Sequence, residues 1–374
     1  MISLLYTKVF KLSNIDFLWC FIAWEEKNMK SLVVPILALA ITVAFFPGTA
    51  RATNESQAAV LLLLIEPGAR QAAMGEAFSA IADDATAGYY NPAGLAFQDR
   101  NRKNIQFMHQ NWLPTLADDL YYEFLGYSQY AEGWGNFAFN VVYFNLGEQA
   151  RTTAYSPDVV GYFTSFEVVA SGSYGATMTD DLSLGITLKA IYSKLSDKGQ
   201  GAEEGSGIGT SFALDFGTMY HTPIKGLTLS AVMHNMGPKI SYIDVSQADP
   251  LPLNMIFGAA YVPVESEFNK LTFVLDIYKP LVRRKGSPVE ALIKGWYDED
   301  DEFKQIDFKI GTEYVYNNFL ALRAGYSYDD DGDLKSPTFG VGVIWDRLNV
   351  DVAYYAATDN PMQDSMRFSF AYDF

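Results

Sequence analysis

The sequence predicts an antiparallel transmembrane β-barrel of about 14 strands, preceded by a short helical plug. Three observations lead to this fold class. The chain contains 24 Tyr and 26 Phe among 374 residues, yet its mean hydropathy is only +0.01. Apolar and polar residues alternate with period two over long runs, and the connections between these runs alternate between short and long. This combination is typical of barrels in a bacterial outer membrane.

The beginning of the chain resembles an export signal. Residues 29–52 begin with Met29-Lys30, continue with an apolar run and end with small residues near Ala52, as a cleaved signal peptide does. Residues 1–28 are then an upstream extension, because a charge interrupts their apolar stretch. A second membrane anchor in this extension is the alternative. Whether translation starts at Met1 or Met29 is left open.

Charge and composition exclude several function classes. The formal net charge of −17 argues against nucleic-acid binding, which needs basic patches. The single cysteine, Cys20, lies in the part expected to be removed, so neither disulfides nor thiolate chemistry is expected. His109, His221 and His234 lie far apart and outside any metal-ligand spacing. We therefore expect no catalytic site, no metal and no cofactor, and we expect that the protein is not an enzyme.

Residues 53–103 are expected to form the plug, a helix followed by an ordered turn. Residues 66–81 are rich in small apolar side chains, which let a helix lie close to surrounding walls. A proline near the start suits a first helical position, and two aspartates end the pattern. An Asn-Pro pair and a nearby glycine then predict a turn. The candidate residues of this plug motif are Pro67, Gly68, Ala69, Arg70, Met74, Gly75, Asp83, Asp84, Asn91, Pro92, Gly94 and Leu95.

Residues 104–374 are expected to form the barrel. In the last segment Phe368, Phe370, Tyr372 and Phe374 share one face while small and polar residues share the other, which is a strand signal. The same rule predicts strands over residues 104–113, 120–131, 133–146, 161–178, 181–195, 208–222, 227–239, 253–264, 270–280, 306–317, 319–329, 337–347, 348–357 and 365–374.

The connections distinguish this barrel from a soluble sandwich. Tight turns alternate with longer polar segments, as expected for short periplasmic turns and long extracellular loops. The longest predicted loops are residues 145–160, 237–252 and 280–305. The last of these carries apolar residues such as Val289, Ile293 and Trp296, which suit contact with a partner or packing within the loop itself.

Charged residues that alternate with lipid-type residues should point into the barrel lumen, because a charge facing lipid near the midplane costs about 2–4 kcal/mol. Inside, they are expected to pair with one another or to hold the plug. The plug residues available for this are Arg70, Glu76, Asp83 and Asp84. The candidate lumen charges are Lys189, Asp276, Lys309, Glu313, Arg323, Asp351 and Arg367.

The motifs PGAR-x-AAMG and ADDA-x-AGYYNPAGLA resemble the N-terminal signature of the PorV/PorQ family of outer-membrane proteins, relatives of the FadL-type barrels. The resemblance implies a role in the type IX protein secretion system. Members bind secreted cargo with a C-terminal sorting domain and pass it from the translocon to the attachment complex. The resemblance covers about forty residues, so the barrel rests on its own strand pattern.

Two other functions remain open at this point. FadL-like passive uptake of a hydrophobic small molecule, such as a fatty acid or hydrocarbon, is the first alternative. A purely structural outer-membrane protein is the second. All three place the chain in outer-membrane lipid. The aromatic end at Phe374 also resembles the terminal signal that barrel-assembly machinery recognises, and an edge strand that happens to end there is the alternative.

Overall fold

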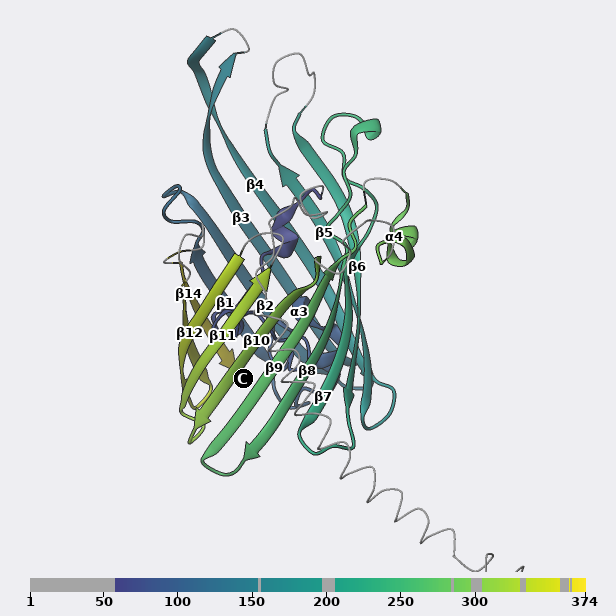
Figure 1. Cartoon of the computed structure of the whole chain (residues 1–374), viewed down its shortest axis with the longest axis vertical. Coiled ribbons are helices and arrows are strands. Elements are labelled where there is room, and N and C mark those ends of the chain that lie inside the picture. Colours follow the sequence, from purple (N-terminus) through teal and green to yellow (C-terminus); the bar gives the residue numbers. More distant parts are fainter. Residues whose placement is uncertain are drawn as a thin grey trace, which may run out of the picture. The chain divides into compact units, whose positions relative to one another are not determined.

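The computed structural model describes residues 58–153, 156–196, 206–283, 286–296, 305–329, 334–356, 363 and 365–374. The expected extension and signal segment lie outside these residues. Within them, fourteen antiparallel strands form a closed barrel in which each strand pairs with its neighbours in sequence and β1 pairs with β14 (Figure 1). The predicted fold class is confirmed. Closure pairs the backbone groups of neighbouring strands around the barrel wall, as a lipid environment requires.

The strand bounds follow the predicted ranges closely for most of the chain. They are β1 Asn104–Asn111, β2 Leu120–Ala131, β3 Gly135–Thr153, β4 Ser156–Thr177, β5 Leu182–Lys194, β6 Ile208–His221, β7 Leu227–Met236, β8 Asn254–Glu265, β9 Asn269–Pro280, β10 Asp307–Tyr316, β11 Leu320–Asp329, β12 Leu334–Trp345, β13 Leu348–Tyr355 and β14 Met366–Asp373.

Side-chain burial follows the period of two. In β14, Phe368, Phe370 and Tyr372 are exposed on the outside, whereas Arg367 and Ser369 are buried inside. The outer wall is therefore apolar and the lumen polar, as in barrels that face lipid. We name the rim with the short turns the turn end and the opposite rim the loop end.

The expected loop at residues 145–160 is wrong. β3 and β4 continue through it as a two-stranded ribbon that rises beyond the other strands (Figure 1). A register shift lies between Asn145 and Glu148, where Gly147 has a φ of 75°. This bulge lets pairing resume above it, because the extra residue is absorbed without ending the ladder. Polar composition alone gave no sign of the continuation.

The continuous helix expected over residues 66–81 is also wrong. The segment contains only short turns of helix: η2 Leu61–Leu64, α2 Ala69–Ala72, α3 Ala87–Tyr90 and η3 Pro92–Phe97. Positive φ angles at Gly75, Glu76 and Ala82 stop the right-handed helix. The small residues allow the chain to fold back on itself compactly, and they do not form one long helix.

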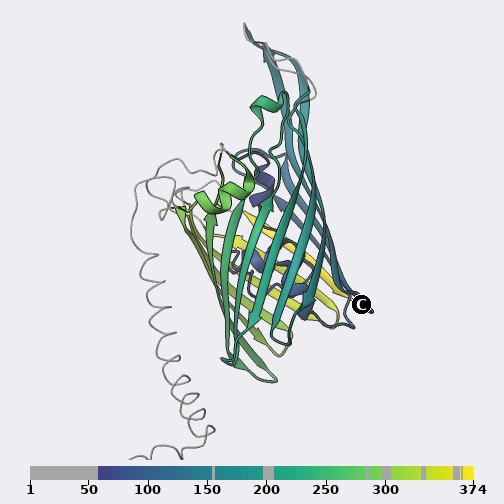
Figure 2. The same cartoon turned by 90° about the vertical axis from the view of Figure 1, so that its right-hand side faces the viewer.

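Two further short helices lie in long connections at the loop end. η4 Val245–Gln247 follows β7, and α4 Pro288–Lys294 follows β9. Figure 2 shows α4 at the level where the strands of this rim end. Among the described residues, no helix combines the length and apolar character needed to cross a bilayer.

Candidate functional site

The N-terminal segment lies inside the lumen and packs against wall strands through glycines. A Cβ built on Gly325 would lie 2.0 Å from the backbone nitrogen of Gly75, and one on Gly311 would lie 2.3 Å from the carbonyl oxygen of Met74. A Cβ on Gly185 would lie 2.2 Å from the backbone of Pro92. No larger side chain fits at these contacts. The segment and the wall are therefore matched backbone to backbone.

The Asn-Pro turn is held by its own side chain and by the wall. Asn91 accepts a hydrogen bond from the Ala93 N–H at 3.0 Å, and its amide donates to the carbonyl oxygens of Ser79 and Thr218 at 2.9 and 3.1 Å. Gly94 fits against Ala82, where a Cβ would meet the carbonyl oxygen at 2.3 Å. The predicted turn residues thus clamp two parts of the segment to β6.

Ion pairs, most of them buried, join the first part of the segment to β10. Arg70 pairs with Glu313 at 2.9 Å and with Asp83 at 2.6 Å. Glu313 also accepts from Arg323 at 2.6 Å, and Arg323 reaches Asp351 at 2.6 Å. Each charge in this group has an opposite charge beside it, which buried charges require. We name these five residues the Glu313 network.

A second set of charges lies where the segment meets the lumen cavity. Lys309 contacts Glu66 at 2.6 Å and Glu76 at 3.5 Å, and Arg367 contacts Glu76 at 3.0 Å. The Tyr355 hydroxyl donates to Glu76 at 2.7 Å. Burial raises the pKa of Glu66 to about 8, although the positive charge of Lys309 acts in the opposite direction. For Glu76, burial is outweighed by Lys309 and Arg367, which lower its pKa to about 2.

Two further acidic residues are held at the inner wall. Asp276 accepts hydrogen bonds from the backbone N–H groups of Phe78 and Ser79, at 2.9 and 3.0 Å, and from the Ser79 hydroxyl at 2.6 Å. Asp215, which the sequence analysis did not single out, pairs with Lys189 at 2.8 Å. Asp215 lies between Leu214 and Phe216, which point outward in β6. This period-two pattern could have identified Asp215 as a lumen residue.

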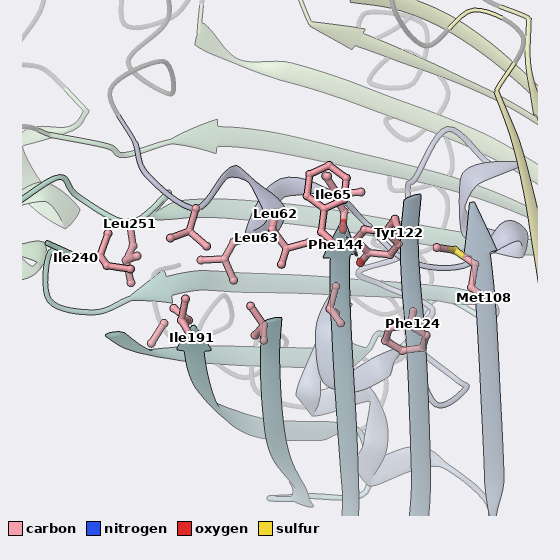
Figure 3. Close-up of a cluster of buried hydrophobic side chains, with 14 residues drawn as sticks. Leu62, Leu63, Ile65, Met108, Tyr122, Phe124, Phe144, Ile191, Ile240 and Leu251 are labelled. Carbon is pink, nitrogen blue, oxygen red and sulfur yellow. Dashed lines mark hydrogen bonds between the residues drawn. The ribbon is translucent and has the colours of Figure 1, made fainter. Parts of the chain in front are cut away.

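A cavity of about 980 Å³ lies above the packed segment at the loop end. Glu66, Glu76, Lys309 and Arg367 line its polar side. The other side is apolar and is built by the residues before the plug motif, where Leu62, Leu63 and Ile65 pack against Phe144 and its neighbours (Figure 3). The cavity therefore joins a hydrophobic wall to a charged floor.

The structure places each candidate residue as follows. Most plug-motif residues are buried in the lumen, whereas Asp83 is exposed. The side chains of all seven lumen candidates lie on the inner face, and only Lys309 is partly exposed to the cavity. They form separate groups rather than one cluster. These groups are the Glu313 network, the set around Glu76, Asp276 with Ser79, and Lys189 with Asp215.

The histidines do not form a joint site. His109 contacts Glu123 at 2.8 Å, His221 contacts Thr228 at 2.9 Å, and His234 lies 3.3 Å from Asp215. Among the residues that the structure describes, no group of three or more His, Cys, Asp or Glu side chains is arranged to hold a metal ion.

Comparison with known proteins identifies the family. The family model described as "Type IX secretion system protein PorV" matches residues 49–286, more than half of the chain. The chain belongs to the PorV family. This match extends far beyond the N-terminal motif and covers the segment in the lumen together with β1 to β9. A search of curated proteins finds no significant match.

Solved structures share the barrel of this PorV-family chain. The toluene transporter TodX of P. putida has 13% sequence identity and a TM-score of 0.50, covering 82% of this chain and 98% of its own. The toluene transporter TbuX of Ralstonia pickettii has 15% identity and a TM-score of 0.50, with 82% and 97% covered. A FadL homologue of Pseudomonas aeruginosa has 12% identity, a TM-score of 0.46, and 82% and 98% covered. At such identities the likeness to TodX and TbuX establishes a shared fold.

Phe374 lies just beyond β14, where its backbone exchanges hydrogen bonds with Lys103 at 2.9 and 3.1 Å. Its ring is exposed and stacks on Tyr372. We propose that the barrel-assembly machinery recognises this exposed terminal ring. Phe374→Ala and deletion of Phe374 should lower the amount of heat-modifiable, assembled barrel in outer membranes more than they lower synthesis. Phe319→Ala, which removes an exposed ring at a turn, is the control. Normal assembly of both Phe374 variants contradicts the proposal.

Proposed function

We propose that this PorV-family barrel receives secreted cargo at its loop end and passes it from the translocon to the attachment complex. The observation that carries the proposal is a cavity that ends on a packed segment. The segment contacts the wall backbone to backbone at Gly325, Gly311 and Gly185, and the cavity lies on one side of it. Close packing of this segment against the wall supports binding of cargo at the loop end rather than passage of cargo through the barrel.

The β3–β4 ribbon supports the same proposal. Above the barrel, residues 148–151 pair with residues 161–164, and the described pairing of β3 with β2 and of β4 with β5 ends below them. Among the described strands, none adds to the outer edges of the ribbon at this height, although the Glu148 N–H donates to Asp119. Such edges are where another chain can add a strand. Val160 and Tyr162 add exposed apolar surface on this ribbon. A polypeptide partner fits these features better than a small solute does.

Site-specific photocrosslinking tests the proposal. A photoreactive amino acid at Tyr162 on the ribbon, or at Leu61 beside the cavity, should capture cargo with its C-terminal sorting domain during secretion. The same group at Phe273, on the apolar outer wall, is the matched control and should capture no cargo. All three side chains are exposed, those of Tyr162 and Phe273 on barrel strands and that of Leu61 on the N-terminal segment. Absence of cargo adducts at both test positions, with the barrel assembled at its normal level, overturns the proposal.

Passive uptake of a hydrophobic small molecule is the second candidate function. The apolar wall of the cavity, with Leu62, Leu63 and Phe144, favours it. Under this alternative, Leu61→Glu should reduce entry of a labelled fatty acid or hydrocarbon into cells while cargo secretion stays normal. Under the first proposal, entry of such solutes should not depend on the barrel at all. Measuring both processes in one strain separates the two functions.

A further inference from the structure

The described part of the connection between β9 and β10 lies over the outside of the barrel, not over the lumen. In β8, Ile256 lines the cavity, so Met255 and Phe257 point outward. In β9, Asp276 holds the segment in the lumen, so Lys279 points outward. Yet Lys279 is only 2% exposed, and its amino group donates to Gln305 at 3.2 Å. The chain that follows β9 therefore covers this part of the outer wall.

One side of α4 accounts for the covering at Met255. Ala291 is buried with Leu253 and Leu281, and Leu292, Met233 and Met255 pack against this group. Met233, like Met255, belongs to the outward set of its strand, because Val232 beside it is buried inside. Figure 1 shows α4 beside the upper ends of the strands, outside their ring. The helix thus rests on the outer wall at the loop end.

The other side of α4 is apolar and uncovered. Val289 and Ile293 lie one helical turn apart and are each 62% exposed. Trp296 follows on the same side and is also exposed. Glu290 and Lys294 pair with each other along the flank, so neither places an unpaired charge on this surface. We name Val289, Ile293 and Trp296 the outer face of α4.

This face continues the apolar wall of the barrel without a break. The ring centroid of Trp296 lies 6.4 Å from that of Phe257, the first exposed outward residue of β8 below the covered Met255. Phe273 in β9 and Leu229 in β7 extend the same exposed wall toward the turn end. That wall faces lipid, because the lumen holds the charges and the outside the apolar residues. Trp at the upper margin of such a wall is typical of the membrane–water interface.

We propose that α4 is a membrane-interface helix whose outer face lies in the outer leaflet, at the boundary between headgroups and acyl chains. Its occupant is lipid because the face adjoins the lipid wall through Trp296 and Phe257, and because the two charged residues of the described helix, Glu290 and Lys294, pair with each other. An apolar helix face in this position gains by leaving water. The helix widens the lipid contact of β7 to β9 and keeps this loop outside the cargo-binding surface proposed above.

Fluorescence quenching in vesicles tests this inference. The full chain in a Cys20→Ser background receives one cysteine at Val289 or Ile293, is labelled with an environment-sensitive dye, and is reconstituted in phosphatidylcholine vesicles. Both labels should be quenched strongly by nitroxide attached near the lipid headgroup, less by nitroxide near the acyl-chain end, and weakly by aqueous iodide. Heat-modifiable migration of each variant shows that the barrel has formed.

Two matched positions calibrate the quenching. Val245→Cys, in η4 of the neighbouring loop, replaces a valine that is 84% exposed, and its label should respond to iodide and not to lipid nitroxide. Phe273→Cys, on the lipid wall, should respond to lipid nitroxide at either depth. Labels at Val289 and Ile293 that behave like the Val245 label overturn the proposal. Labels shielded from both quenchers also overturn it, because they indicate protein rather than lipid against this face.

Discussion

Replacing Gly75 with alanine is expected to release the N-terminal segment from the lumen while the barrel still forms. Gly75 has a φ of 65°, a conformation that costs other residues roughly 1–2 kcal/mol. A Cβ there would also lie 2.7 Å from the backbone nitrogen of Tyr326 and 2.8 Å from the carbonyl oxygen of Ile310. These backbone atoms belong to the paired strands β10 and β11, so they cannot move aside freely. Overpacking by the alanine Cβ adds about 1–3 kcal/mol to this cost, and the larger side chain of Gly75→Phe should be more destabilising still.

Limited proteolysis measures this release. Arg70 is the only trypsin site between residues 58 and 99, and in the packed segment it is held by Glu313 and Asp83. Cleavage after Arg70 should accelerate in Gly75→Ala, although migration remains heat-modifiable. Gly133→Ala is the matched control, because Gly133 also has a positive φ, 76°, but has nothing within 4 Å of its Cβ position. Equal cleavage rates in wild type, Gly75→Ala and Gly133→Ala contradict this packing.

The same variant connects packing to function. With the segment displaced, the cavity loses the floor formed by Glu66 and Glu76. Cargo should then remain unprocessed if the barrel receives cargo, whereas entry of hydrophobic solutes should change if the barrel conducts them. Normal secretion and normal solute entry in Gly75→Phe, with the variant present at wild-type level, show that the packed segment serves neither function.

Glu313→Ala is expected to destabilise the same segment through charge rather than through volume. Its carboxylate contacts both Arg70, at 2.9 Å, and Arg323, at 2.6 Å. Removing it leaves Arg70 with Asp83 and Asp84, and Arg323 with Asp351. Loss of one partner from a buried ion pair costs about 3–5 kcal/mol, because the remaining charge stays out of water. The midpoint of urea unfolding in detergent should fall, and cleavage after Arg70 should accelerate.

Two variants show whether the effect comes from the buried network. Glu313→Gln keeps the volume and one acceptor oxygen but replaces the other oxygen with an NH2 donor and removes the charge. Its unfolding midpoint should therefore lie between those of wild type and Glu313→Ala. Glu290→Ala removes the partner of Lys294 from the surface helix α4, where an ion pair contributes little, and should leave unfolding unchanged. If Glu313→Ala and Glu290→Ala unfold alike, the Glu313 network does not stabilise the protein.

The strands were predictable because their signal is local. Outward residues face lipid and inward residues face a polar lumen. The sequence therefore alternates between the two kinds, as Phe368, Phe370 and Tyr372 do with Arg367 and Ser369. Every described strand overlaps its predicted range, and the errors gather at the ends. The largest is the β3–β4 ribbon, which depends on a bulge between the two strands rather than on the composition of either one.

The fold of the segment in the lumen was not predictable to the same degree. Its small residues were recognised, but a helix was expected where Gly75, Glu76 and Ala82 turn the chain back. Local propensity favours a helix for Ala-rich sequence, and contact with Gly311 and Gly325 overrides it. Those glycines lie more than 200 residues further along the chain. The pairing of Arg70 with Glu313 depends on the same long-range contact.

The sequence by itself determined that this chain forms a barrel, which strands compose it and which side of each strand faces lipid. It did so because each of these properties repeats every second residue. Only the tertiary structure decided which charged residues form ion pairs, how the Asn-Pro turn is hydrogen-bonded to β6, and that α4 packs against the outer wall. Such contacts join residues far apart in the chain, and their energy depends on distance and burial that no local pattern records.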